Sequence, residues 1–242
     1  SEVGLHRSGN EDSALINGVL IAVADGMGGH AGGEVASKVA ITTLAQILPL
    51  LNNDEMDPES LEAFLMGSLL DIDQEIRQTV FDDDRLSGMG TTLTAIALYR
   101  DRAYVLHAGD SRAYRLRGKE LQQITKDHSV VQELIDSGAI TEAEAAFHPQ
   151  RSVLTNVLMG LGNITPVLVE YEAKPGDKFL LCSDGLSNVV SNSEIHEYMK
   201  HENAIAELIT LTYERGAPDN VTVVIAEVGD NETATEFFGA AK

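Results

Sequence analysis

The chain has 242 residues, 43% of them hydrophobic, and its 38 acidic and 17 basic residues give a formal net charge of −21. A chain of this length and apolar content can bury a large core, and we expect one domain. The strong negative charge repels nucleic acid and anionic lipid, which argues against both as binding partners. Most of the acidic side chains are expected to be solvated surface groups.

The single cysteine, Cys182, ends the apolar run 179–182. One cysteine cannot form an intrachain disulfide, which favours a reducing, cytoplasmic compartment. We interpret Cys182 as a small core side chain, because a buried thiol without an activating neighbour is a poor nucleophile. No apolar stretch of the roughly 18 residues that cross a bilayer is expected, and no signal peptide is visible. The chain starts at Ser1 almost directly in a motif, so we expect native residues to precede it.

Hairpins and helices alternate along the first half of the chain. Asn17-Gly18 predicts a type I′ turn between two strands, because this dipeptide tolerates the positive φ angles of that turn. Apolar residues three and four apart over 61–80 predict a long amphipathic helix, with Asp57 as its N-cap and Pro58 at its first helical position. Another helix is expected over 33–48, and strands over 91–98, 102–108 and 113–117.

Shorter elements fill the second half. Capping boxes formed by Thr141 with Glu144 and by Ser191 with Glu194 predict two short helix starts. Helices are also expected over 129–137 and 203–215, and strands over 167–171, 179–182 and 221–228.

The order of these elements predicts the fold class. Hairpins that alternate with helix pairs, rather than a regular strand-helix-strand repeat, favour an α+β fold of antiparallel sheets packed together and covered by helices. The domain is expected to span residues 1–229, with 230–242 a polar tail or linker. Between 140 and 162 the pattern is irregular, which predicts a mobile insertion.

Four aspartates stand at the ends of strands or loops. Asp25-Gly26 follows an apolar strand, Asp184 follows another, and Asp110 and Asp219 occupy related positions. Taken alone, each Asp-Gly pair is a simple turn. Together they suggest one convergent site, where gathered carboxylates repel each other unless cations neutralise them. Oxygen ligands predict Mg²⁺ or Mn²⁺ rather than zinc.

A further element near the start places Arg7 beside Asn10-Glu11-Asp12. Arginine holds a phosphate dianion through two parallel hydrogen bonds, so Arg7 is a candidate phosphate ligand. The alternative for a lone arginine is a surface ion pair.

Together these motifs resemble the metal-dependent, type-2C Ser/Thr protein phosphatases, and the match runs from Arg7 to about Val228. The chain is most similar to bacterial members, especially those that oppose receptor-type Ser/Thr kinases in actinobacteria. Six motifs in order carry the resemblance: Arg7 with Asn10-Glu11-Asp12, Val23-Ala24-Asp25-Gly26-Met27-Gly28-Gly29-His30, Gly88-Met89-Gly90-Thr91-Thr92, Gly109-Asp110-Ser111-Arg112, Ser183-Asp184-Gly185-Leu186, and Asp219-Asn220-Val221-Thr222-Val223.

The resemblance implies a four-layer α-β-β-α sandwich, in which two antiparallel sheets are flanked by helix pairs and the metals sit at one end. It implies two core ions, Mn²⁺ or Mg²⁺, with Asp25 as the bridge between them. Gly26 would ligate one ion through its carbonyl, Asp184 and Asp219 would bind the first ion, and Asp12 would support the second through water. The role of Glu11 stays open.

A third, weaker ion is also implied, with Asp110, Asp184 and Ser152 as its ligands. The implied mechanism is attack on phosphorus by a hydroxide held between the core ions, while Arg7 holds the phosphoryl oxygens. His30 is the nearest titratable candidate for protonating the leaving group, with a structural role as the alternative. Eukaryotic members carry their histidine where Met27 stands.

The implied enzyme is a phosphoprotein phosphatase that reverses Ser/Thr kinase signalling. Its expected partners are phosphorylated proteins, Ser/Thr kinases among them, and it is expected to act as a cytoplasmic monomer. Whether the parent chain continues past Lys242 into a membrane anchor stays open. Family members have a strand before the arginine motif, so the first strand is expected to be truncated here.

Two alternatives to this function remain. One is a phosphatase of an anti-sigma antagonist, which keeps the fold and narrows the substrate. The other is a catalytically inactive regulatory relative, although such a chain should lack one of Asp25, Asp184 and Asp219, and all three are present.

Overall fold

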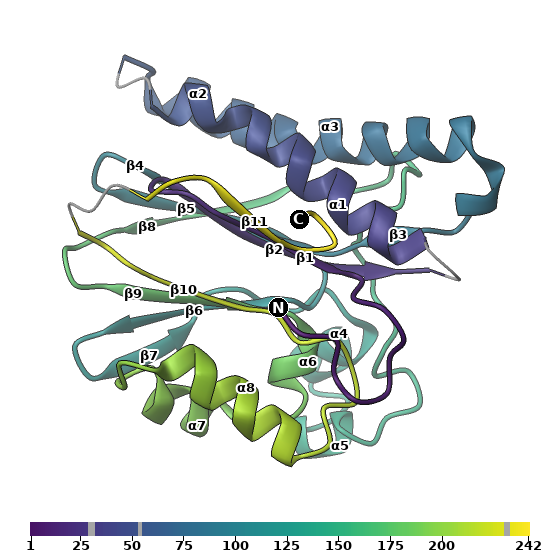
Figure 1. The fold of residues 1–242 in the computed structure, drawn as a ribbon, viewed down its shortest axis with the longest axis vertical. Coiled ribbons are helices and arrows are strands. Elements are labelled where there is room, and N and C mark those ends of the chain that lie inside the picture. Colours follow the sequence, from purple (N-terminus) through teal and green to yellow (C-terminus); the bar gives the residue numbers. More distant parts are fainter. Residues whose placement is uncertain (29–31, 53–54, 230–232) are drawn as a thin grey trace.

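Two antiparallel sheets face each other in the computed structural model, and helices cover the outer face of each sheet (Figure 1). The structure describes residues 1–28, 32–52, 55–229 and 233–242. The layers run helix, sheet, sheet, helix, which is the α+β sandwich that the order of elements predicted.

The larger sheet has seven strands in the order β11-β1-β2-β4-β5-β8, with β3 paired to β2. All its pairings are antiparallel. Its strands are β1 (Asp12–Ile16), β2 (Leu20–Met27), β3 (Gly90–Thr91), β4 (Leu93–Tyr99), β5 (Arg102–Ala108), β8 (Val167–Glu172) and β11 (Glu236–Gly239).

The smaller sheet has four strands in the order β10-β9-β6-β7. It consists of β6 (Arg112–Arg117), β7 (Glu120–Gln123), β9 (Lys178–Cys182) and β10 (Val223–Glu227). The chain passes from the larger sheet to the smaller one between β5 and β6, at Gly109, whose φ is +106°. A Cβ there would lie 2.5 Å from Thr92, so only glycine fits this crossing.

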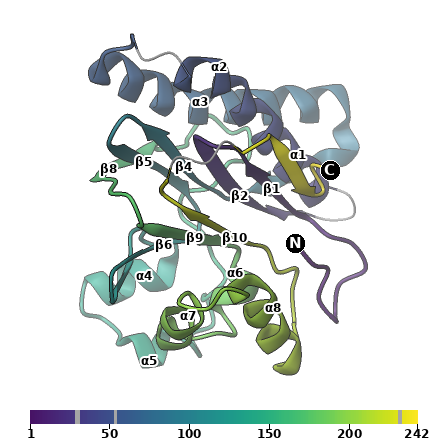
Figure 2. The same ribbon diagram turned by 60° about the vertical axis from the view of Figure 1, so that its left-hand side comes forward.

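Helices cover the two outer faces (Figures 1 and 2). The larger sheet carries α1 (Gly32–Leu44), η1 (Ala45–Ile47), α2 (Leu48–Leu51), α3 (Pro58–Asp82) and the short η2 (Asp84–Leu86). On the side of the smaller sheet lie α4 (Val130–Asp136), α5 (Glu142–Ala145), α6 (Asp184–Ser187), α7 (Asn192–Tyr198) and α8 (Ala204–Glu214).

The predicted helix starts are confirmed by their caps. Asp57 accepts a hydrogen bond from the backbone N–H of Ser60 at 2.9 Å, and Pro58 opens α3. Reciprocal capping boxes at Thr141 and Ser191 begin α5 and α7. Each such cap stabilises a helix by about 1 kcal/mol, because it satisfies backbone donors that have no intrahelical partner.

The core consists of three apolar clusters, one between each pair of adjacent layers. Strand β4 carries apolar residues on both of its faces. Ala95 and Ala97 face the helices α1 and α3, whereas Ile96 faces the other sheet. Successive strand residues point to opposite faces, so a central strand of the sandwich must be apolar on both.

The helical run Gly32–Leu51 is long and apolar enough to cross a membrane by length and composition, with a mean hydropathy of 1.3. The expectation that no segment meets these two criteria is therefore wrong. The side chains on one face of this run are fully buried between the helix layer and the larger sheet: Ala36, Ala40, Ile41 and Leu44. We interpret the run as an amphipathic core helix.

The hairpin at Asn17-Gly18 is confirmed, but the type I′ turn is wrong. The N–H of Asn17 donates to the carbonyl of Leu20 at 2.8 Å, which closes the turn, and neither Gly18 nor Val19 has a positive φ. Asn17 instead stands at the first turn position, where its side chain accepts the N–H of Val19 at 3.0 Å.

The expectation of a polar tail over 230–242 is wrong for Glu236–Gly239, which form the edge strand β11. Phe237 packs into the helix-side cluster and Phe238 into the cluster between the sheets. The two aromatic side chains therefore anchor opposite faces of a strand whose other residues are polar or small.

Candidate functional site

Two of the predicted aspartates lie opposite each other on neighbouring strands. Asp12 begins β1 and Asp25 lies near the end of β2, and their Cα atoms are register partners. The backbone of Asp25 is held by the Gly-Thr-Thr segment: its N–H donates to the Thr92 hydroxyl at 3.0 Å, and the Thr91 hydroxyl donates to its carbonyl at 3.0 Å.

Two more of the predicted aspartates, Asp184 and Asp219, lie at strand ends of the smaller sheet. Asp184 follows β9 and starts α6, while Asp219 precedes β10. A Cβ on Gly185 would lie 1.9 Å from the carbonyl oxygen of Asn220, so the two motifs touch through their backbones. Glycine at this position therefore lets the two segments approach each other closely.

Asn220 was not predicted as a site residue, yet it joins the aspartate motifs to the N-terminal loop. Its Oδ1 accepts the N–H of Glu11 at 2.8 Å, and its Nδ2 donates to the carbonyls of Val3 and Gly9. Its position directly after Asp219 was the one feature of the sequence that could have indicated a role in the site.

The electrostatics show that the aspartates converge. Burial first, and then the neighbouring carboxylates of Asp12, Asp184, Asp110 and Asp219, raise the pKa of Asp25 well above its usual range. Burial likewise raises the pKa of Asp12 to about 7, against the hydroxyls of Thr222 and Ser183, which lower it.

Asp110 and Asp184 belong to the same electrostatic cluster. Burial and then the charge of Asp184 raise the pKa of Asp110 to about 7. Burial and the charge of Asp219 raise the pKa of Asp184. Like charges this near to one another disfavour full ionisation, and a bound cation would relieve this repulsion.

Several of these carboxylates are bound by protein groups. The Ser183 hydroxyl donates to Asp12 at 2.7 Å, and the Asn188 side chain donates to Asp184 at 3.0 Å. Within the described residues, no three His, Cys, Asp or Glu side chains form a ready-made metal site.

The residues nevertheless fit a divalent cation. Oδ1 of Asp12 is buried and has no hydrogen-bond partner among the described residues, a costly state for a carboxylate oxygen. Asp25, Asp110 and Asp184 remain partly accessible, so an ion can reach them. A set of carboxylate oxygens without thiol or imidazole suits Mg²⁺ or Mn²⁺.

Gly26 and Glu11 lie beside the cluster. The N–H of Gly26 donates to the Glu11 carbonyl at 3.2 Å, and a Cβ on Gly26 would lie 2.1 Å from the Gly33 carbonyl oxygen. Burial raises the pKa of the Glu11 carboxyl, and the positive charge of Arg7 partly offsets this rise.

Arg7 lies at the cluster but is engaged by an aspartate. Its Nη2 donates to Oδ2 of Asp219 at 2.6 Å, and about half of its side chain is exposed. This bond is the main reason that the pKa of Arg7 is raised.

Two further residues were predicted for the site, His30 and Ser152. His30 lies outside the described residues. Ser152 lies exposed in the loop after α5, and its role as a ligand of a third ion stays a prediction.

A buried hydroxyl network behind Asp25 was also missed from the sequence. The hydroxyls of Thr92 and Ser111 lie 2.6 Å apart, and the Thr94 hydroxyl donates to the Ser111 carbonyl at 2.8 Å. Thr94 also contacts Nδ1 of His107 at 3.0 Å, while Nε2 of His107 bonds to the carbonyl of Lys126. His107 is thus a buried core residue with a partner for each of its ring nitrogens.

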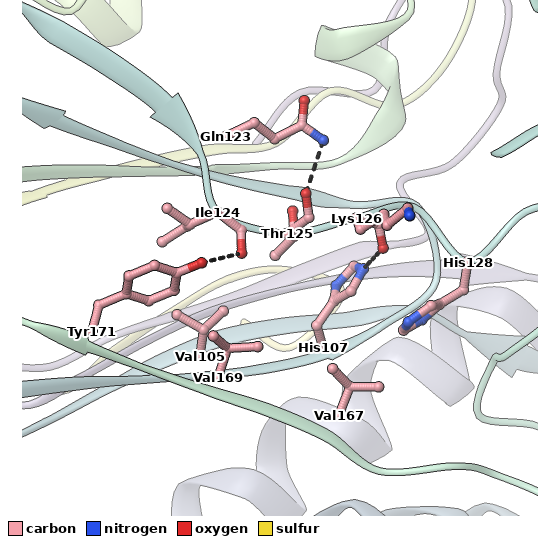
Figure 3. A pocket seen from close by; sticks show the side chains of 10 residues that line it. All are labelled: Val105, His107, Gln123, Ile124, Thr125, Lys126, His128, Val167, Val169 and Tyr171. Atoms are coloured by element: carbon pink, nitrogen blue, oxygen red, sulfur yellow. Dashed lines mark hydrogen bonds between the residues drawn. The ribbon is translucent and has the colours of Figure 1, made fainter. Parts of the chain in front are cut away.

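A cavity of about 320 Å³ lies beside this histidine, between β5, β8 and residues 123–128 (Figure 3). The rings of His107 and His128 lie 4.6 Å apart in its wall. None of the predicted metal ligands lines it, so this cavity is separate from the aspartate cluster.

Comparison with known proteins supports the interpretation of these motifs. The model of the protein phosphatase 2C family matches residues 10–226. The serine/threonine protein phosphatase PstP of Mycobacterium tuberculosis is 47% identical over 234 residues, or 95% of this chain and 44% of that protein. The chain therefore spans less than half the length of that relative. The serine/threonine phosphatase stp of Listeria monocytogenes is 34% identical, over 93% of this chain and 92% of its own.

Solved structures agree with the fold. The crystal structure of the M. tuberculosis phosphatase superposes with a TM-score of 0.89 at 44% identity, and covers 95% of this chain and 97% of that one. The catalytic domain of PstP in complex with two manganese ions gives a TM-score of 0.85 at 43% identity, over 95% and 96% of the two chains.

Proposed function

The chain belongs to the protein phosphatase 2C family, and from this we propose that it is a metal-dependent phosphatase of phosphoserine and phosphothreonine in proteins. The observation that carries the proposal is the convergence of Asp12, Asp25, Asp110 and Asp184, whose pKa values are raised by burial and by one another. A group of this kind is stabilised by bound cations.

We assign the cluster to two core ions. Asp25 bridges them, Gly26 contributes its carbonyl, Asp184 and Asp219 hold the first ion, and Asp12 supports the second through water. When bound, Mn²⁺ or Mg²⁺ supplies neutralising charge and activates water for attack on phosphorus. A two-manganese complex of the PstP catalytic domain supports this assignment. Asp110, Asp184 and Ser152 are proposed to hold a third, weaker ion.

Arg7 and His30 are proposed to act on the phosphate group itself. Arg7 exchanges its bond to Asp219 for bonds to two phosphoryl oxygens, since a guanidinium matches a phosphate in two-point geometry. His30 gives a proton to the leaving serine or threonine oxygen. Replacing His30 by Ala should therefore slow the hydrolysis of an alkyl phosphate more than that of an aryl phosphate, because the aryl leaving group needs less protonation.

The substrates are proposed to be phosphorylated proteins, including Ser/Thr kinases, acted on by a cytoplasmic monomer. The presence of Asp25, Asp184 and Asp219 together argues against a catalytically inactive relative. Nothing among the described contacts favours the narrower alternative, an anti-sigma antagonist substrate.

The test is hydrolysis of p-nitrophenyl phosphate and of a phosphothreonine peptide with Mn²⁺, Mg²⁺ or EDTA. We expect activity with either metal, none in EDTA, and none in Asp25→Asn. Exposed Asp71 on α3 provides the matched control Asp71→Asn, which should stay active. Activity that persists in EDTA would falsify the proposed metal chemistry.

A further inference from the structure

The C-terminal strand β11 lies along β1 and ends beside Asp12 (Figure 1). Its pairing brings Gly239 opposite Ser13, and the next N–H, that of Ala240, donates to the carbonyl oxygen of Asp12 at 2.8 Å. On its other side Asp12 is paired with Asp25 of β2. The main chain of Asp12 is therefore held between the C-terminal strand and the strand that carries the central aspartate.

Gly239 fits this position only because it has no side chain. Its φ is +65°, and a Cβ would lie 2.1 Å from the carbonyl oxygen of Asp12. Real Cβ atoms do not approach an oxygen so closely, so any other residue must displace either the strand end or Asp12. The left-handed backbone adds about 1 kcal/mol of strain for a residue with a Cβ.

The strand is anchored independently of Asp12. Phe237 and Phe238 pack into two different core clusters, on opposite faces of the larger sheet. The anchored strand therefore resists displacement at Gly239, which leaves Asp12 to move.

The Asp12 side chain has little room to absorb such a movement. It is fully buried, its Oδ2 accepts a hydrogen bond from the Ser183 hydroxyl at 2.7 Å, and its Oδ1 has no partner in the part of the chain that the structure describes. A shift of its backbone changes where the unpaired oxygen points relative to Asp25.

From these contacts we propose that the end of β11, Gly239 with Ala240, is a positioning element for the ion that Asp12 supports. It contacts neither substrate nor metal, and acts by fixing the main chain of Asp12. The inference rests on the proposed metal-dependent function. Gly239 and Ala240 thus help to position Asp12 although they follow it in the chain by more than two hundred residues.

The experiment compares Gly239→Ala with Gly118→Ala by calorimetric titration of each protein with Mn²⁺. Gly118, at the turn between β6 and β7, is a matched control, because its φ is +61° and a Cβ added there would meet no atom within 4 Å. Both variants carry similar backbone strain, and Gly239→Ala should lose more thermal stability because its Cβ also clashes with the carbonyl of Asp12. Only Gly239→Ala should weaken Mn²⁺ binding, by about tenfold or more, the usual cost of disturbing a residue that orients a metal ligand.

A second variant, Ala240→Pro, removes the N–H that bonds to Asp12 and places the Cδ of the proline ring against the same carbonyl oxygen, so it should weaken Mn²⁺ binding in the same direction. It serves as the deciding variant if Gly239→Ala fails to fold. Wild-type affinity for Mn²⁺ in the folded variants, Gly239→Ala or Ala240→Pro, overturns the positioning role. Absence of Mn²⁺ binding by the wild-type protein instead overturns the proposed function, and the positioning role with it.

Discussion

Arg7 donates a hydrogen bond to Asp219 at 2.6 Å, so the proposed phosphate ligand is paired with a proposed metal ligand. A cation at Asp219 would compete with the guanidinium for the same carboxylate oxygen. With the proposed ligands, metal binding would therefore be coupled to release of Arg7 toward phosphate.

Replacing Arg7 by Ala should lower kcat/KM for a phosphothreonine peptide by about 30-fold to 150-fold, equivalent to roughly 2–3 kcal/mol for hydrogen bonds to a charged group. Arg7→Lys keeps the charge but loses the two-point geometry, so it should recover only part of the activity. Steady-state kinetics with saturating Mn²⁺ measure the effect. Exposed Arg85, paired with Asp83, supplies the control Arg85→Ala; equal losses in both variants contradict the role of Arg7.

Asp73 anchors the end of the irregular segment 140–162. Its buried carboxylate on α3 accepts the backbone N–H groups of Met159, Gly160 and Gly162, at 3.2, 2.7 and 2.8 Å. Leu158, just before them, exchanges two backbone hydrogen bonds with Thr91, which in turn holds Asp25.

Asp73→Ala should therefore lower the free energy of unfolding by roughly 2–4 kcal/mol, because it leaves buried N–H donors without partners. It should also reduce kcat, since the Thr91 contact loses its support. Urea unfolding followed by circular dichroism gives the first quantity. Asp71→Asn on the same helix is the control for the lost charge. A free energy of unfolding equal to that of the wild type in Asp73→Ala would show that these hydrogen bonds do not stabilise the fold.

The sequence predicted local features that depend on local chemistry. Asp57 caps α3, and Thr141 and Ser191 form their capping boxes, because these interactions involve residues three apart in the chain. The four strand-end aspartates were also visible, since each follows or adjoins an apolar run.

What the sequence could not predict depends on contacts between distant segments. Strand β11 exists because Phe237 and Phe238 meet two core clusters that other segments build. The bond of Asn220 to the loop of Glu11 joins residues 209 positions apart. Neither arrangement leaves a periodic pattern in the chain.

His107 should make the folded state less stable as the solution is acidified, whereas the buried aspartates, whose pKa values are raised, act in the opposite direction. Burial, and then the neighbouring His128, lower the pKa of His107 to about 3 from its usual 6.5. Below pH 6.5 His107 binds a proton in the unfolded chain but stays neutral in the folded protein. This contribution therefore lowers the free energy of unfolding progressively as pH falls toward 3.

From this group alone we expect a loss of about 2 kcal/mol between pH 7 and pH 5. His107→Gln should remove this loss from the stability difference between the two pH values, whatever it does to stability at pH 7. Urea titrations at the two pH values provide the comparison, with exposed His6→Gln as control. Parallel pH profiles for wild type and His107→Gln would contradict the assignment.

Cys182 should be dispensable for catalysis, although it ends the strand that leads to Asp184. The thiol is fully buried in the cluster beneath α6 and α8, and burial raises its pKa to about 12. The nucleophile of a cysteine phosphatase is a thiolate, which this site disfavours at neutral pH. Cys182→Ala should keep the kcat of the wild type and lose about 1 kcal/mol of stability for the missing sulfur contacts. Iodoacetamide should leave the native enzyme active, whereas EDTA should abolish activity. Inactivation of the native wild type by iodoacetamide, with Cys182→Ala protected, would place the thiol in the reaction and contradict water as the attacking group.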